Sequence, residues 1–162
     1  EIASCLVGSE MCIRDSEMSA LEQAAPELPY IQGITPEFMR HVALRWAVGG
    51  LPFSGNPSRK MGGWVRLREV AEEPVNEAHL LALVDAWPPS LMPVLKQPAA
   101  GSTLTWTIEF IQPVAQLSTH DWCRYCVETE HARDGYGHAA AALWTADGVL
   151  LALSRQTVTV FA

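Results

Sequence analysis

Residues 76–95, NEAHLLALVDAWPPSLMPVL, form the longest apolar stretch of the chain that has a helical period. Asn76 is a good N-cap residue, so the helix should begin there. Pro88 and Pro89 should end or kink its first part, because proline removes a backbone donor. We expect the rest of the chain to wrap around this helix and to bury most of its sides. The apolar stripe consists of Leu80, Val84, Trp87 and Leu91, widened by Leu81 and Leu83.

The same stretch contains one carboxylate, Asp85, with no basic residue within four positions. A carboxylate in an apolar helix is costly unless it is hydrogen-bonded, paired or hydrated. The negative end of the helix dipole also disfavours it near the helix C-terminus. Asp85 is therefore a candidate functional residue, and a partly solvated carboxylate that accepts a hydrogen bond from a loop amide is the structural alternative.

Length and composition limit the class of protein. A chain of 162 residues with 49% hydrophobic residues can build one domain around a proper core. The net charge is -7 and no cluster of lysine or arginine occurs, so we expect no nucleic-acid partner. No apolar run reaches the roughly 18 residues that a membrane helix needs, so we expect no membrane association and a cytoplasmic protein.

Two of the four cysteines, Cys123 and Cys126, form a C-x-x-C pair in a strand-like context. Residues three apart in a strand point to opposite faces, and no second pair at zinc spacing follows, although His120 and His131 are near. We therefore expect ordinary buried thiols in a reducing compartment, and neither a metal site nor a cofactor.

The N-terminal part divides into three segments of different character. Residues 1–16 contain CLVGSEMCIRDS, which resembles sequencing read-through found at the ends of many unrelated translated proteins. We interpret them as a non-native leader and exclude them from fold reasoning. Residues 17–37 are acidic and punctuated by proline, which is typical of a linker or of the remnant of a preceding domain. Residues 38–162 then form the expected domain.

The strand pattern predicts the architecture. In residues 138–145 four alanines favour a helix, but the Asp-Gly turn that follows predicts a β-hairpin instead. The predicted order is two strands, a helix and four strands, or five strands in all if residues 121–145 form one bent strand. Either order is an α+β arrangement. One helix wrapped by a curved antiparallel sheet is the hotdog fold. The strand-like segments are residues 38–50, 61–70, 103–114, 121–131, 138–145 and 149–161.

The C-terminal third resembles the second half of the double-hotdog acyl-CoA thioesterases of the thioesterase II type. The pattern has a threonine that opens a Ser/Thr-and-aromatic strand ending in proline, here STLTWTIEFIQPV. A Trp-containing strand, a Gly-containing turn and a DG-x-L-x-A-x-x-x-Q ending follow, and this ending spans Asp147 to Gln156. The family's aspartate near the helix end is matched by VDAW at Asp85. The resemblance covers residues 34–162, about one hotdog.

The resemblance implies a function in fatty acid metabolism, the hydrolysis of acyl-CoA to free acid and CoA. Asp85, Thr103 and Gln156 match the positions that hold and activate the hydrolytic water in that family. Where the family strand often reads Asp-His-Ser, this chain has Trp106 between two threonines, which would narrow the acyl tunnel. No G-x-S-x-G motif occurs, which disfavours a serine hydrolase.

Two other functions are open. The chain is alternatively a non-catalytic acyl-CoA-binding or assembly half of a double-hotdog protein. A hydratase acting on enoyl-CoA would use an Asp/His pair, but His79 and Asp85 are six residues apart and should point to different helix faces. A lone hotdog leaves a sheet edge uncovered, so we expect a homodimer or pairing with a missing N-terminal half.

Four further residues or pairs admit both a functional and a structural interpretation. His120 and Asp121 resemble a catalytic pair, although a polar loop is the simpler interpretation. His138 is either a substrate contact or a solvent-facing residue at a bend. Arg66 and Arg68 fit either the phosphates of CoA or a solvated strand face.

Overall fold

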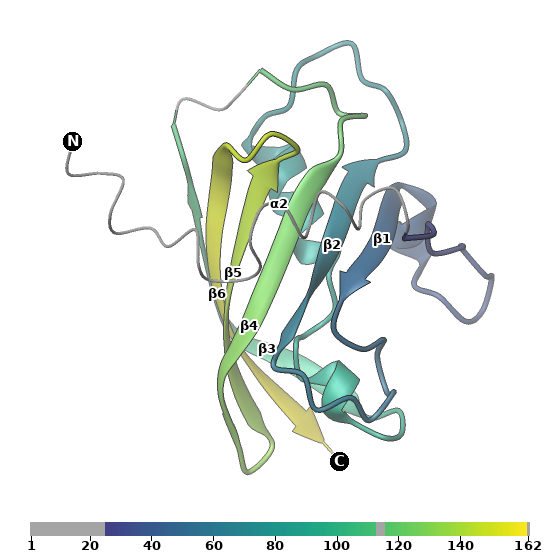
Figure 1. Cartoon of the computed structure of the whole chain (residues 1–162), viewed down its shortest axis with the longest axis vertical. Helices are drawn as coiled ribbons and strands as arrows, with labels where there is room; N and C mark the ends of the chain where they lie inside the picture. The colour runs from purple at the N-terminus through teal and green to yellow at the C-terminus, as the bar shows by residue number, and fades with distance from the viewer. Residues whose placement is uncertain (1–24, 113–115, 162) are drawn as a thin grey trace.

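The computed structural model describes residues 25–112 and 116–161 (Figure 1). Its helix and strands follow in the predicted order, and the strand bounds differ from the prediction by a few residues. The first strand is an exception, because residues 37–40 form a 3-10 helix after Pro36 instead of extending it. The elements are η1 (Glu37–Arg40), β1 (Val42–Val48), β2 (Lys60–Leu67), α2 (Glu77–Asp85), η2 (Met92–Val94), β3 (Ala100–Phe110), β4 (Cys123–Arg133), β5 (Tyr136–Thr145) and β6 (Leu150–Phe161).

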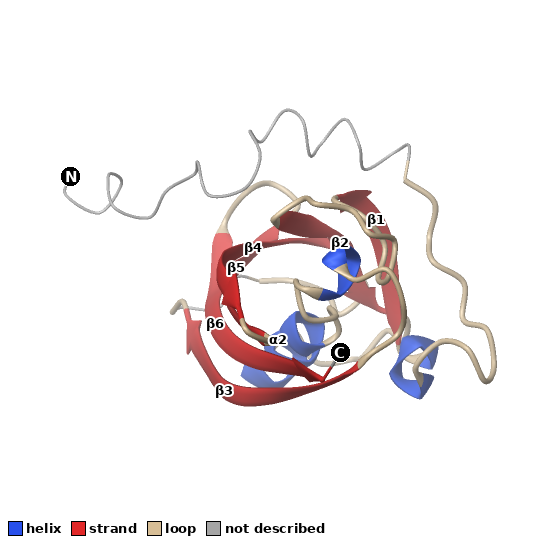
Figure 2. Ribbon diagram, turned by 90° about the horizontal axis from the view of Figure 1, so that it is seen from below, coloured by secondary structure: helices blue, strands red, loops and turns tan. Residues whose placement is uncertain are grey.

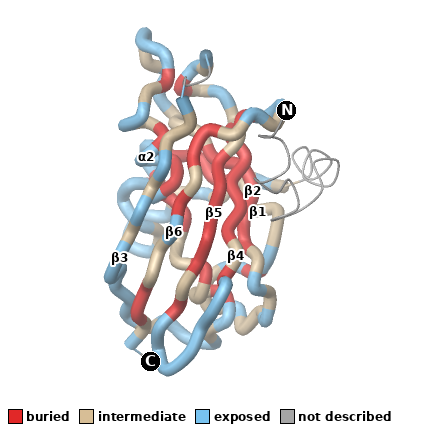
Figure 3. Tube along the Cα trace, turned by 90° about the vertical axis from the view of Figure 1, so that its left-hand side faces the viewer, coloured by how far each residue is buried: buried red, intermediate tan, exposed pale blue. Residues whose placement is uncertain are grey.

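The six strands form one antiparallel sheet in the order β1-β2-β4-β5-β6-β3. Figure 2 shows that this sheet curves around α2. The predicted α+β hotdog architecture, one helix wrapped by a curved antiparallel sheet, is thereby confirmed. β3 lies at the edge beside β6, although β4 follows it in the chain. Figure 3 shows that β3 is far more exposed than the central strands.

Residues 136–145 form a strand, as the Asp-Gly turn predicts, in spite of their four alanines. The turn to β6 is closed by Gly148 at φ +93°, and its backbone N–H donates to the Thr145 carbonyl at 3.1 Å. Alanines 139–142 are buried and pair with β4 on one side and β6 on the other. These two ladders override the helix propensity of alanine, which is a weak local preference.

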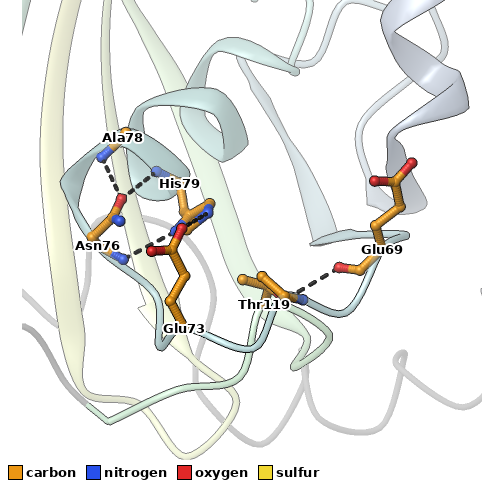
Figure 4. Close-up of polar contacts among 7 residues, drawn as sticks. Glu69, Glu73, Asn76, Ala78, His79 and Thr119 are labelled. Carbon is orange, nitrogen blue, oxygen red and sulfur yellow. Dashed lines mark hydrogen bonds and ion pairs between the residues drawn. The ribbon is translucent and has the colours of Figure 1, made fainter.

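α2 begins directly after its N-cap residue Asn76, because the Asn76 side chain accepts hydrogen bonds from free backbone N–H groups of the first turn (Figure 4). Asn76 Oδ1 accepts from the backbone N–H groups of Ala78 and His79 at 3.1 and 3.2 Å. The His79 ring closes the capping box, since its Nδ1 accepts from the Asn76 N–H at 3.2 Å. The predicted N-cap is confirmed.

The helix ends at Asp85, just before the two prolines that were predicted to end or kink it, so the apolar stripe does not continue as a helix to residue 95. Ala86 makes the last helical hydrogen bond, to the Ala82 carbonyl at 3.1 Å, and the two prolines at 88 and 89 prevent continuation. Trp87 and Leu91 therefore lie beyond the helix. No helix in the described part of the chain is both long and apolar enough to cross a membrane.

The helix is also not buried on most sides, which corrects a second expectation. Leu80, Leu83 and Val84 are buried against the sheet. A second face is exposed and carries Leu81 and Asp85. The sheet of this chain covers only one side of the helix, so the other side is left open.

Candidate active site

Thr103 and Gln156, two of the three predicted site residues, are in direct contact. The side-chain amide Nε2 of Gln156 donates to the Thr103 hydroxyl oxygen at 2.9 Å. Gln156 stands directly opposite Trp106 in the β3–β6 register, and a shift between Thr103 and Thr105 inserts Leu104 as an extra residue. Such a bulge re-aims the side chains beside it. The bulge at Leu104 thus lies directly beside Thr103, which accepts the hydrogen bond from Gln156, 53 positions further along the chain.

Trp106 is fixed next to this pair. Its indole N–H donates to the Ser154 hydroxyl at 2.9 Å, and Ser154 is buried two residues before Gln156 on β6. The ring packs against the hydrophobic core, so it is half-buried and cannot swing freely. A bulky side chain therefore stands beside the Thr103–Gln156 pair, where the sequence suggested that it would narrow a tunnel.

Asp85, the third predicted residue, is the last residue of α2 and is exposed. Within the described residues it makes no hydrogen bond or ion pair, and it does not contact Thr103 or Gln156 by either interaction. Asp85 instead lines an apolar cavity that does not include those two residues. The structure thus joins two of the three candidates by a hydrogen bond and leaves the third without a direct polar contact to them.

The cavity has a volume of about 450 Å³, which is within the range of small-molecule sites. It lies between the end of α2, β1 and the segment that precedes β1. Asp85 is the one ionisable side chain that the described part of the chain contributes to its wall. The lining consists of Leu28, Pro29, Ile31, Ile34, Thr35, Pro36, Phe38, Met39, Leu44, Trp46, Pro52, Phe53, Asp85, Ala86, Trp87, Pro88 and Met92.

Two tryptophans of the cavity wall, Trp46 and Trp87, belong to a row of three aromatic rings. Trp87 stacks on Tyr125 with ring centroids 4.9 Å apart and meets Trp46 at 5.2 Å with a tilt of 48°. Burial raises the pKa of Tyr125 above its usual value, and the charge of Asp85 raises it further. Tyr125 is therefore neutral at physiological pH and lies within the electrostatic reach of Asp85.

The segment before β1 contributes apolar side chains to this cavity, which the sequence pattern did not predict. Leu28, Ile31, Ile34 and Phe38 are its apolar members. The signal was present, since these side chains recur at intervals of three and four in a stretch otherwise rich in proline and acidic residues. It was too short and too interrupted to predict a packed element.

His79, the histidine of the hydratase alternative, is engaged at the start of the helix. Its Nδ1 accepts the Asn76 N–H, and its Nε2 lies 3.9 Å from a Glu73 carboxylate oxygen. His79 and Asp85 thus occupy opposite ends of α2. A shared role in proton transfer has no geometric support here.

His120 and Asp121 belong to a polar loop and do not form a catalytic pair. His120 Nε2 lies 2.7 Å from an Arg66 guanidinium nitrogen, and Asp121 accepts the Ser118 backbone N–H at 2.8 Å. The guanidinium of Arg66 also covers the ring of Trp122 at 4.5 Å.

The other two candidates for substrate contacts are held locally as well. Arg68 pairs with Glu27 and donates to the Met39 carbonyl at 3.1 Å. His138 lies 3.3 Å from a Glu130 carboxylate oxygen and 3.0 Å from the Thr157 hydroxyl.

Cys123 is a free, buried thiol. Burial raises its pKa to about 12, and the nearby Asp121 charge adds to the shift. Cys126 is buried too but is not a free thiol, so the expectation of two ordinary thiols is correct only for Cys123. Across residues 25–112 and 116–161, no group of three His, Cys, Asp or Glu side chains gathers closely enough to hold a metal ion.

Comparison with known families gives one match over most of the chain. A family model described as the acyl-CoA thioesterase C-terminal domain matches residues 19–160. No protein of curated function matches the sequence significantly.

Solved structures show the same fold at low sequence identity. A hot dog fold protein of unknown function from Alicyclobacillus acidocaldarius is 23% identical with a TM-score of 0.71, over 86% of this chain and 52% of that one. A proposed thioesterase II from Thermobifida fusca is 20% identical with a TM-score of 0.66, over 85% and 53%. The tesB protein of Mycobacterium avium subspecies paratuberculosis is 17% identical with a TM-score of 0.61, over 85% and 55%. The chain therefore spans about half the length of these structures.

Proposed function

The chain belongs to the family of acyl-CoA thioesterase C-terminal domains, and we propose that it hydrolyses acyl-CoA thioesters to free acid and CoA. The observation that carries this proposal is the 2.9 Å hydrogen bond between Gln156 and Thr103, because the two residues were predicted as site residues independently of any contact. A thioester is an activated acyl group, so one oriented water suffices for the attack.

Each of the three side chains has a defined role in the proposed reaction. Gln156 donates to the Thr103 oxygen, which leaves the Thr103 hydroxyl hydrogen free to hold the water or the thioester carbonyl. Asp85 accepts a proton from the water as the water oxygen bonds to the carbonyl carbon. The carbon–sulfur bond then breaks, and the proton passes to the departing CoA thiolate. In this proposal the thioester and the water bridge Asp85 and the Thr103–Gln156 pair, which make no direct hydrogen bond to each other.

We also propose that a second hotdog half completes the site. β3 is an edge strand whose first residues are exposed, and its Leu104 is 52% exposed. The face of α2 that carries Leu81 and Asp85 is open as well. Exposed, uncovered strand edges invite pairing with another chain. The partner is either a second copy of this chain or an N-terminal half, since the chain spans about half of its structural relatives.

The decisive experiment is to measure CoA release from a panel of acyl-CoAs with a thiol reagent, for the wild type and for Asp85→Asn. We expect the substitution to lower kcat by about 10²–10⁴-fold, the usual contribution of a positioned general base. Asp85 is exposed and unpaired, so the variant should retain the circular dichroism spectrum and melting temperature of the wild type. Full activity in Asp85→Asn would exclude the proposed mechanism.

The second candidate function is a non-catalytic acyl-CoA-binding half. The observation that favours it is that Asp85 makes no hydrogen bond or ion pair with Thr103 or Gln156 within the described residues. This candidate predicts that acyl-CoA raises the melting temperature without being hydrolysed. A hydrolysis rate clearly above background excludes it.

A further inference from the structure

The wall of the cavity beside Asp85 is built largely by one short segment, residues 28–39, which we name the N-terminal arm. The arm lies beside β1 (Figure 1). It supplies eight of the seventeen lining residues, whereas β1 supplies only Leu44 and Trp46. The shape of the cavity therefore depends on the arm more than on any single strand or helix.

The arm has a defined conformation and firm attachments. The Leu28 N–H donates to the Leu44 carbonyl at 2.8 Å, and the neighbouring Glu27 pairs with Arg68. A local turn is closed twice, since the Thr35 N–H donates to the Ile31 carbonyl at 2.9 Å and the Ile31 N–H donates to the Thr35 hydroxyl at 2.8 Å. The arm is thus a preformed wall, which a ligand can contact without first ordering it.

Three apolar side chains of the arm line the cavity and yet stay partly in water. Ile31, Ile34 and Phe38 are 45%, 77% and 43% exposed. Clustered apolar groups at a cavity mouth indicate a ligand that covers them, because removal of apolar surface from water is favourable. An apolar group that enters between the arm and Trp87 would remove this surface from water.

The charge of the wall selects among apolar ligands. Among the described residues, the lining contains no lysine, arginine or histidine, and its one ionisable residue is Asp85. A second carboxylate inside the cavity would be desolvated, would lack a cationic partner and would be repelled by Asp85. An uncharged alkyl or aryl group meets none of these costs.

We infer that the N-terminal arm is the specificity-determining wall of the acyl pocket, which takes an uncharged apolar acyl group and rejects one that ends in a carboxylate. The identity of the ligand as an acyl-CoA rests on the proposed function. The binding measurements that test the pocket do not, because they require no turnover.

The test compares two non-hydrolysable thioethers of equal length, S-hexyl-CoA and S-(5-carboxypentyl)-CoA, with CoA alone by titration calorimetry on the full chain. We expect S-hexyl-CoA to bind about tenfold or more tightly than the carboxylated analogue, in line with the cost of one mismatched group in an apolar pocket. Equal affinities for the two thioethers would overturn the inference.

The arm is tested by Ile31→Asp, with Val149→Asp as the matched control. Ile31 is 45% exposed and lines the cavity, whereas Val149 is 50% exposed and does not. We expect Ile31→Asp to weaken S-hexyl-CoA binding about tenfold while the affinity for CoA alone stays unchanged, and Val149→Asp to change neither. Unchanged S-hexyl-CoA binding in Ile31→Asp would overturn the role of the arm. If Ile31→Asp fails to fold, Phe38→Ala replaces it with the same expectation.

The outcomes for binding and for catalysis are separable. Selective binding of S-hexyl-CoA without hydrolysis of hexanoyl-CoA would refute the proposed reaction but support the inferred specificity of the pocket. Hydrolysis of hexanoyl-CoA and adipyl-CoA with equal kcat/KM would support the proposed reaction but refute the inference that the pocket rejects a terminal carboxylate.

Discussion

The Gln156 side-chain amide donates to the Thr103 hydroxyl at 2.9 Å, across the boundary between the last strand and the edge strand of the sheet. This contact orients both groups, since the amide fixes which lone pair of the hydroxyl is occupied. The position of each side chain in the candidate active site therefore depends on the other.

A double-mutant cycle should show that the two residues act as a unit. We expect Gln156→Ala and Thr103→Val each to lower kcat/KM for a short acyl-CoA by about 10–100-fold, and the double variant to lose little more than the worse single variant. The measurement is steady-state CoA release for the four proteins. Losses that multiply fully would mean that the two residues act independently.

Removal of the helix cap should destabilise the fold without touching the chemistry. We expect Asn76→Ala to lower the free energy of unfolding by about 1 kcal/mol, because the N–H groups of Ala78 and His79 lose their acceptor. Urea denaturation measures this loss. His79→Gln is the control, since glutamine at this position can also close a capping box, and it should keep both stability and activity. A loss of hydrolysis in His79→Gln would revive a catalytic role for His79.

Stability should fall at alkaline pH. Burial, assisted by the Asp121 charge, raises the pKa of the Cys123 thiol from its ordinary value of 9.0 to about 12 in the folded protein. The unfolded chain therefore releases this proton first, so the contribution to stability is complete below pH 9 and is lost as pH rises toward 12. The raised pKa of buried Tyr125 acts in the same direction. We expect the melting temperature to fall steadily above pH 9 and to fall less in Cys123→Ala. A constant melting temperature from pH 9 to 11 would contradict this account.

A charge on the edge strand should weaken association. We expect Leu104→Lys to shift the protein toward monomer in light scattering, because lysine on an exposed strand edge discourages edge-to-edge pairing. Val149→Lys, at a residue of similar exposure in the β5–β6 turn, is the control and should leave the oligomeric state unchanged. If the wild type is already monomeric, the proposed pairing between copies is wrong and the N-terminal half remains as the partner.

Local patterns in the sequence determined the order of the elements, the N-cap at Asn76 and the β-hairpin at Asp147 and Gly148. These features depend on neighbouring residues, on side-chain period and on turn chemistry, so they can be predicted without knowledge of the fold. The resemblance supplied Asp85, Thr103 and Gln156 as candidates, because it depends on residue types at fixed spacing.

Only the tertiary structure decided which of these residues meet. The pairing of β3 with β6 brings Thr103 to Gln156. The folding of the N-terminal arm against β1 and the end of α2 encloses the cavity beside Asp85. Beyond the end of the helix at Asp85, Trp87 stacks on Tyr125, a partner 38 residues further along the chain. Such contacts between distant segments depend on which surfaces bury each other, and a local pattern of residues does not contain that information.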